Sequence, residues 1–255
     1  MFRVYLCRCC FPGELCSGFI CAVAVFPGSD VLIITLNLIK MQLERQYTQP
    51  IIAAIVRVLL YGGLLYIVAE LIYLDSVTLT HTGKYGEHSY TEWTQEIMLL
   101  IASLLYFTLG RYDRTITGFT GMMSGMAIMA FIREFNNYFH TWFKGAWQMF
   151  VLIALILTII YVYRNRDTFI KPFYEYLKLP AFGVTMSGFV SLMVFSRLFG
   201  RGRMWRNILE VDDLEGPYRW VKNAAEEGTE LLGYALIFIG TIEYCWFIWN
   251  RKRHE

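Results

Sequence analysis

The stretch PIIAAIVRVLLYGGLLYIVAELIY, residues 50–73, decides the fold, because it is almost continuously apolar and carries only Arg57 and Glu70 as charges. As an α-helix rising 1.5 Å per residue it is roughly 36 Å long, which exceeds the ~30 Å hydrocarbon core of a bilayer. Hydrocarbon offers no hydrogen bonds to the backbone, so only helices or closed barrels can span it. The run lacks the alternation of barrel strands and therefore predicts a membrane-spanning helix.

Five more runs of similar character follow, separated by short blocks of charge. With the first, they lie at 50–73, 94–110, 115–133, 146–163, 180–199 and 231–249. The chain of 255 residues is 56% hydrophobic and 17% charged, whereas soluble domains carry about 25% charged residues. Pro50 and Pro180 stand where runs begin, and a helix tolerates the missing N–H there. We therefore predict an all-α, polytopic transmembrane helical bundle with six spans.

The distribution of Lys and Arg predicts the orientation of this bundle, since cytoplasmic loops of membrane proteins are enriched in both. If the residues before the first run are cytoplasmic, the inner segments carry the excess, which is clear once the loop at 200–230 is set aside. We expect a multi-pass protein of the plasma or inner cell membrane with both termini in the cytoplasm. The loop at 200–230 is rich in cations and acids, which is typical of a structured or functional element.

The segment 1–40 differs from the six-span part at 41–255. It holds five of the six cysteines, namely Cys7, Cys9, Cys10, Cys16 and Cys21. Their spacing does not form the paired C-x-x-C motifs of zinc sites, and no histidine is near, so no zinc site is expected. Three interpretations stay open: a signal-like segment with Ala-Val-Ala at 22–24, an extra span interrupted by Pro-Gly at 27–28, or a mis-assigned start with the true first residue at Met41.

Unusual polar residues gather at the helix ends that this orientation places outside. They are Glu92, Glu96, Arg133, Glu134, Asn137, Arg197, Glu226, Glu227 and Glu230, and we call them the outer polar cluster. Because four spans supply them at one level, we expect one shared site. Its chemistry could be structural ion pairing, proton or cation handling, a phospholipid headgroup site with acid/base chemistry, or divalent-metal binding. The E-x-x-H pairs of carboxylate-bridged metal sites are absent, which argues against metal.

Several function classes are excluded by missing motifs. No G-x-S-x-G, H-E-x-x-H or P-loop occurs, and no basic stripe with interleaved aromatics indicates nucleic acid. We expect no metal, no cofactor, and membrane lipids as partners. The leading interpretation is a transporter-like, ion- or proton-handling protein. The alternatives are a lipid-modifying enzyme using the same cluster and a non-catalytic accessory subunit. A transporter needs a water-filled path from the cluster toward the cytoplasm, and an enzyme needs a pocket closed on its inner side.

Small residues four apart mark two helix faces that another helix can approach closely. Gly121 with Gly125 and Gly183 with Ser187 have this spacing. We interpret them as packing within the bundle, with a homodimer or a partner helix as the alternative.

Arg57 and Glu243 lie inside the first and last runs, each seven residues from the inner end, which is about 10 Å of helix. An unpaired charge at such depth costs ~2.5–3.5 kcal/mol on insertion scales. We therefore predict a structural intramembrane pair of Arg57 with Glu243. Snorkelling of the Arg57 side chain to the headgroups is the alternative.

Overall fold

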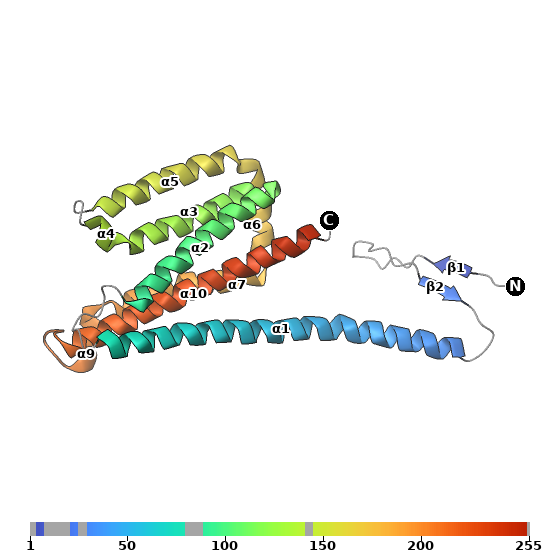
Figure 1. Ribbon diagram of the computed structural model, residues 1–255, viewed down its shortest axis with the longest axis horizontal. Helices are drawn as coiled ribbons and strands as arrows, with labels where there is room; N and C mark the ends of the chain where they lie inside the picture. The colour runs from blue at the N-terminus through green and yellow to red at the C-terminus, as the bar shows by residue number, and fades with distance from the viewer. Residues whose placement is uncertain (1–3, 8–20, 25–29, 80–88, 141–144, 254–255) are drawn as a thin grey trace. The chain divides into compact units, whose positions relative to one another are not determined.

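The structure is a computed structural model and describes residues 4–7, 21–24, 30–79, 89–140 and 145–253 (Figure 1). Side chains are described for residues 47–78, 89–136, 138–139 and 145–253. The chain forms two compact units, residues 1–60 and 61–255. Helix α1 (Asp30–Leu79) begins in the first unit and ends in the second.

The first unit contains a small hairpin before α1. Strands β1 (Val4–Cys7) and β2 (Cys21–Ala24) pair antiparallel, with Cys7 opposite Cys21. The other N-terminal cysteines, Cys9, Cys10 and Cys16, lie outside the described residues. The three interpretations of segment 1–40 therefore stay predictions.

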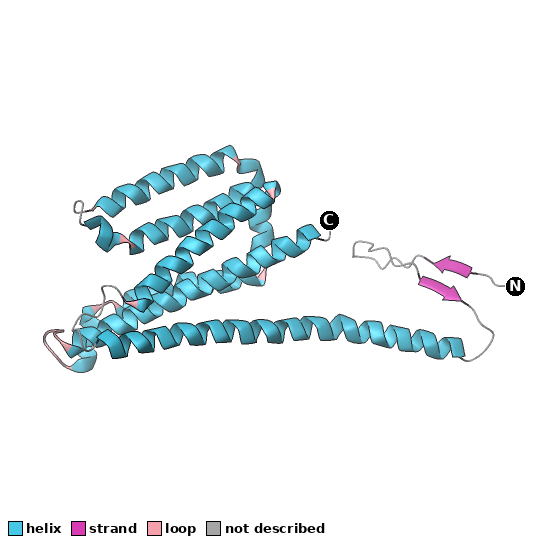
Figure 2. Ribbon diagram, in the orientation of Figure 1, coloured by secondary structure: helices cyan, strands magenta, loops and turns pink. Residues whose placement is uncertain are grey.

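The described part of the second unit consists of helices joined by turns (Figure 2). After α1 come α2 (Tyr90–Tyr112), η1 (Arg114–Ile116), α3 (Thr117–Glu134), α4 (Asn136–His140), α5 (Ala146–Arg164), η2 (Arg166–Thr168), α6 (Ile170–Leu177), α7 (Pro180–Val190), η3 (Ser191–Ser196), α8 (Arg197–Phe199), α9 (Gly202–Leu209) and α10 (Pro217–Arg253).

Six of the described helical segments are long and apolar enough to cross a membrane. They are Tyr47–Thr78, Tyr90–Tyr112, Arg114–Glu134, Ala146–Arg164, Pro180–Phe199 and Pro217–Arg253. This confirms the predicted six-span, all-α architecture of an integral membrane protein. The fifth span has the predicted bounds, whereas the last one is much longer than the run that predicted it.

Helix α10 begins at Pro217, well before the predicted start at 231. Proline suits the first turn of a helix, and the alanines and glutamates that follow have high helix propensity. Hydropathy identifies only the apolar part of a helix. The polar first turns of α10 therefore lie outside the run at 231–249 that predicted the span. The fifth and sixth spans are therefore connected only by α9 and a turn from Glu210 to Gly216. The residues Glu210 and Gly216 both have positive φ.

Helix α10 is the most buried span, and α5 is mostly exposed. Figure 1 shows α3 alongside α2 and α5, and α10 contacts α2, α7 and η3. Packing beside α10 includes a buried cluster of Val68, Met98, Leu231 and Ala235. This cluster joins α1 to α2 and α10.

The glycine face of α3 packs inside the chain. A Cβ on Gly121 would collide with the Tyr161 ring, and a Cβ on Gly125 would collide with the Thr158 side chain, both of α5. The small-residue stripe of α3 therefore allows α5 to approach closely.

Helix α7 approaches α10 through a different face from the one that the sequence indicated. A Cβ on Gly188 would lie 2.5 Å from the Gly233 carbonyl oxygen of α10, whereas Gly183 has open space around it. Ser187 is exposed and donates a hydrogen bond to the Gly183 carbonyl at 2.8 Å. A homodimer or partner helix on this open face stays a prediction.

The fifth span changes its helix type partway along. Residues Ser191–Ser196 form the π-helix η3, followed by the short helix α8. A π-helix is rare and is found most often near functional sites. Here it ends at Ser196 and directly precedes Arg197, two polar residues at this end of the fifth span.

Candidate functional site

Asp75 positions one part of the outer polar cluster, because it joins the end of α1 to the start of α2. The buried Asp75 carboxylate accepts hydrogen bonds from the backbone N–H groups of Tyr90 and Thr91, at 2.9 and 2.8 Å, and from the Thr91 hydroxyl. Ser89 Oγ accepts from the Glu92 N–H at 3.1 Å. These bonds satisfy the free donors of a helix start and fix the first turn of α2, which carries Glu92.

Arg133 lies between two carboxylates at this level. Glu134 accepts a hydrogen bond from the Tyr234 hydroxyl at 2.6 Å, and Glu230 accepts one from Ser196 Oγ at 2.7 Å. Arg133 Nε is 3.7 Å from Glu134 Oε1, and its Nη2 is 3.9 Å from Glu230 Oε1. Both separations exceed the 2.7–3.2 Å of an N–H···O hydrogen bond. The guanidinium is therefore shared loosely by two acids.

The remaining glutamates of α10 are half-buried rather than in open solvent. Lys222 Nζ lies 2.7 Å from Glu226 Oε2, one helical turn away. Gln95 Nε2 donates to the Glu227 backbone carbonyl at 3.2 Å. Among the described residues, the buried Glu227 Oε2 has no hydrogen-bond partner. The position of Glu230 is explained by its contacts with Ser196 and Arg133, not by helix capping.

A cavity of about 570 Å³ opens within the cluster. It is lined by Glu92, Arg133, Glu134, Asn136, Trp147 and Arg197, which come from α2, α3, α4, α5 and α8. Pockets for small molecules have volumes of roughly 300–1,000 Å³. All of its lining residues except Trp147 are polar or charged, so the cavity suits a polar group of matching size.

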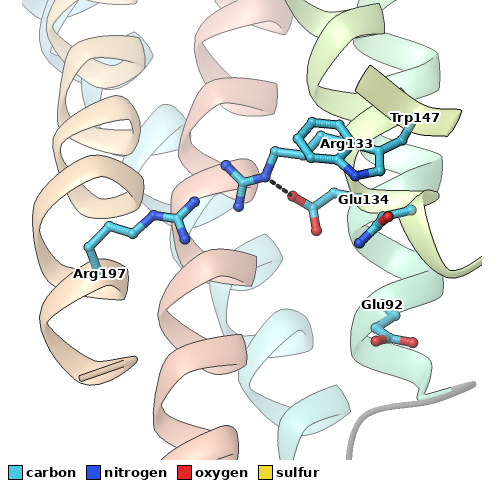
Figure 3. A pocket seen from close by; sticks show the side chains of 6 residues that line it. Glu92, Arg133, Glu134, Trp147 and Arg197 are labelled. Carbon is cyan, nitrogen blue, oxygen red and sulfur yellow. Dashed lines mark ion pairs between the residues drawn. The ribbon is translucent and has the colours of Figure 1, made fainter. Parts of the chain in front are cut away.

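Two arginines face each other in this cavity. Figure 3 shows the Arg197 and Arg133 side chains pointing toward one another, with Arg133 also paired to Glu134. Arg197 forms no ion pair with the described carboxylates. Like charges repel at close range, so this pair of guanidiniums creates a place where an anion is stabilised.

The predicted residues contribute to the site unequally. Glu92, Arg133, Glu134 and Arg197 line the cavity, while Glu96 is buried one turn further along α2. The Asn137 side chain lies outside the described residues. Trp147 and Tyr234 were not predicted, because an aromatic residue near a helix end normally indicates only the membrane interface.

Several side chains deeper in the bundle are apolar, although the buried Glu96 lies one turn beyond Glu92 on α2. Leu99, Leu192 and Tyr234 form a buried cluster, with Ala130, Phe131 and Ile237 packed against it. Further along, the rings of Tyr106, Phe119, Tyr176 and Tyr244 pack with centroids 5.0–6.2 Å apart. Among the described residues, these apolar layers lie between the two ends of the bundle.

A second polar network, absent from the sequence predictions, lies at the opposite end of the bundle. We call it the inner clamp, because the charge distribution predicts that this end is cytoplasmic. Arg251 near the end of α10 places Nη2 2.9 Å from Asp113 Oδ2 and Nη1 3.0 Å from Glu175 Oε2. Thr115 donates to Asp113 Oδ1 from its backbone N–H at 3.0 Å and from its hydroxyl at 2.7 Å. Lys252 Nζ lies 3.9 Å from the same oxygen. The signal in the sequence was an acid within Arg-Tyr-Asp-Arg, 111–114, directly after a span.

Asp113 is only 1% exposed. This burial alone raises the pKa of Asp113, but the hydrogen bonds from Thr115 and Arg251 and the nearby Lys252 outweigh it, so the pKa lies below its ordinary value. Asp113 is therefore held as a carboxylate that ties the α2–α3 corner to the end of α10.

The predicted pair of Arg57 and Glu243 stays a prediction. Arg57 is exposed within the first unit, and Glu243 is buried within the second. Both residues take part in interactions, so neither is without a partner.

Among the described residues, no three His, Cys, Asp or Glu side chains are placed to hold a metal ion. Comparison with protein-family models, curated proteins and solved structures found no match.

Proposed function

We propose that this integral membrane protein binds a phosphate-bearing lipid headgroup in the cavity of the outer polar cluster. The observation that carries the proposal is the position of Arg197, which points across the cavity toward Arg133 and has no ion pair of its own with the described residues. A guanidinium recognises a phosphate by parallel N–H···O bonds, and two guanidiniums around one cavity can hold both sides of the group.

The apolar layer beneath the cavity supports a binding pocket rather than a conduit. Leu99, Leu192 and Tyr234 are buried one to two turns along their helices from Glu92, Arg197 and Glu230. A pocket at a helix-end level, with apolar side chains deeper in the bundle, is the geometry expected for a headgroup whose acyl chains remain in the bilayer. It is also the geometry that a lipid-modifying enzyme requires, with Glu134 as the acid nearest Arg133.

Proton or ion handling is the second candidate, and a specific chain of contacts favours it. One continuous chain of contacts crosses α10, α3 and η3, and it runs from Tyr234 through Glu134, Arg133 and Glu230 to Ser196. Such linked titratable groups are a common feature of proton relays. Proteoliposomes with an imposed pH gradient would distinguish the two candidates, because a proton-handling protein dissipates the gradient and its Glu230→Gln variant does not.

Binding of a short-chain phospholipid tests the first proposal. The purified protein is titrated in detergent with dihexanoyl phosphatidic acid, and the dissociation constant is measured for wild type and for Arg197→Gln. Loss of one charge-assisted contact, worth about 1.5–3 kcal/mol, should weaken binding at least about tenfold.

The matched control is Arg206→Gln. Arg206 lies on α9, beyond the same end of the fifth span, is exposed, and does not line the cavity. Equal affinity of the Arg197→Gln and Arg206→Gln variants would remove the headgroup proposal.

A further inference from the structure

We propose that the site selects a phosphate monoester, such as the phosphate of phosphatidic acid, over a phosphate diester, and that Glu230 sets this selectivity. The inference rests on the phosphate site proposed above and names the class of headgroup that it takes. A monoester has three terminal oxygens and a charge of about −1.5 to −2 at pH 7. A diester has only two such oxygens and a single charge.

The two guanidiniums of the cavity require several oxygens from one ligand. Figure 3 shows Arg133 and Arg197 pointing toward one another. A guanidinium binds a phosphate most strongly through two parallel N–H···O bonds. Three terminal oxygens can accept such bonds from both arginines if one oxygen is shared, whereas the two oxygens of a diester can accept them from only one. A phosphate bound by both arginines is therefore a monoester.

Competition for Arg133 favours the ligand with the larger charge. Arg133 Nε is 3.7 Å from Glu134 Oε1, and its Nη2 is 3.9 Å from Glu230 Oε1. A phosphate must draw the guanidinium away from both acids. A second ligand charge strengthens the attraction of the phosphate to both arginines, whereas the attraction of the acids to Arg133 is unchanged. The two acids therefore hinder the binding of a diester more than that of a monoester.

Glu230 is the acid whose charge can be removed with the smallest change to the site. Its Oε1 accepts a hydrogen bond from Ser196 Oγ at 2.7 Å, and the amide oxygen of a glutamine can accept the same bond. Glu230 is not among the described residues that line the cavity, whereas Glu134 is. The substitution Glu230→Gln therefore loosens the hold on Arg133 without changing a lining residue.

The size of the cavity does not discriminate between the two kinds of phosphate. Its volume of about 570 Å³ lies within the roughly 300–1,000 Å³ of small-molecule pockets, so the methyl group of the smallest diester can be accommodated. We therefore expect the selectivity to come from the charge of the phosphate and its number of terminal oxygens.

Two short-chain lipids that differ by one methyl group provide the test. They are dihexanoyl phosphatidic acid, a monoester, and dihexanoyl phosphatidylmethanol, a diester. Dissociation constants are measured in detergent at about pH 7.5, where the monoester carries its second charge. The proteins are wild type, Glu230→Gln and Glu215→Gln, the last of which removes an exposed acid as the control.

Wild type and the control should prefer the monoester by about tenfold, which corresponds to about 1.4 kcal/mol. Glu230→Gln should bind the diester more tightly than wild type does, because Arg133 then has only one competing acid. Its preference for the monoester should fall below about threefold.

A pH experiment on wild type keeps the proposal open to refutation if Glu230→Gln does not fold. The second pKa of a phosphate monoester is about 6, so both lipids carry close to one charge at about pH 5. The preference for the monoester should then fall to about twofold. The ratio of the two affinities is compared, because Arg133, Arg197, Glu134 and Glu230 face both lipids alike. A preference that is unchanged at this pH overturns the inference.

Glycerol 3-phosphate separates a lipid from a soluble ligand, because it carries the same monoester without acyl chains. Weaker binding than that of dihexanoyl phosphatidic acid supports a lipid as the source of the phosphate. Equal binding supports a soluble monoester and overturns the lipid as the source.

The remaining outcomes separate this inference from the proposed function. If Arg197→Gln weakens both lipids but wild type binds them equally, the monoester inference is wrong and the phosphate site stands. A tenfold preference that survives in folded Glu230→Gln also overturns the inference. If Arg197→Gln changes neither affinity, the proposed function itself fails.

Discussion

The two ends of the bundle use the same residue types in opposite ways. In the inner clamp, Arg251 is 2.9 Å from Asp113 and 3.0 Å from Glu175. In the outer polar cluster, Arg133 is 3.7 and 3.9 Å from its two acids. The inner arginine forms direct hydrogen bonds, whereas the outer one is held near its partners without bonding them closely.

This difference indicates which end is free to bind something else. Two Thr115 donors and Arg251 saturate the inner carboxylate, so little is left for a ligand. At the outer end, Arg197 lacks an ion pair with the described residues, and Glu227 Oε2 lacks a hydrogen bond. Arg197 also lines a cavity. Polar groups with complete sets of short contacts stabilise a fold, whereas polar groups around a cavity that lack partners are available to a ligand.

The largest expected effect comes from removing the inner carboxylate. Asp113→Ala leaves Arg251 and Thr115 without their acceptor, and we expect a loss of about 2–3 kcal/mol in the free energy of unfolding. Arg197→Gln should change this free energy by less than about 0.5 kcal/mol, since Arg197 forms no ion pair with the described residues. Both are measured by denaturation of the purified protein in detergent micelles.

The control for this experiment is Asp213→Ala, which removes an exposed acid. If Asp113→Ala is no less stable than Asp213→Ala, the inner clamp does not stabilise the fold, and the contrast between the two ends is lost.

A smaller effect is expected where α7 crosses α10, because this close approach holds Ser196 beside Glu230. Gly188→Ala places a methyl group against the Gly233 backbone, and overpacking of this kind should cost about 1–2 kcal/mol. Gly183→Ala lies on the same helix in open space and should be neutral or slightly stabilising. Thermal unfolding of the two variants side by side measures the difference. Equal midpoints would mean that the two helices can separate at no cost.

The smallest effect is the pH dependence of the inner clamp. The pKa of folded Asp113 is below its ordinary value, which is about 4 in an unfolded chain. Its contribution to stability is therefore complete above about pH 4 and is lost as the pH falls through the lower, folded pKa. We expect the melting temperature of wild type to fall below pH 4 more steeply than that of Asp113→Asn. Parallel curves would show that other carboxylates dominate the acid response.

The positions of the six spans could be predicted from the sequence, because a span is recognised by the length and apolar composition of its run alone. The fifth span at 180–199 has its predicted bounds, and all six predicted runs are helical. The start of α10 was placed wrongly, because its polar turns carry Glu226, Glu227 and Glu230 and have no apolar signal. Propensity alone would have continued the helix toward Pro217.

The site was predicted at the level of helix ends but not of contacts. Topology placed Glu92, Arg133, Glu134 and Arg197 near one level, and they do line one cavity. Pairings such as Tyr234 with Glu134 depend on the rotation of each helix about its axis. A span that is apolar on all sides does not indicate this rotation. The inner clamp was missed for another reason: cations are common at cytoplasmic helix ends, so Arg251 looked ordinary.

The π-helix η3 has a consequence for how the cationic side of the cavity is encoded. Its hydrogen bonds run from i to i+5, so the segment Ser191–Ser196 accommodates extra chain before Arg197. A single-residue deletion there would permit an uninterrupted α-helix, in which each residue turns by about 100°. Arg197 would then point to another side of the span although its own identity and that of its neighbours were unchanged. The direction in which the Arg197 side chain points thus depends on the number of residues in the span as well as on their identity.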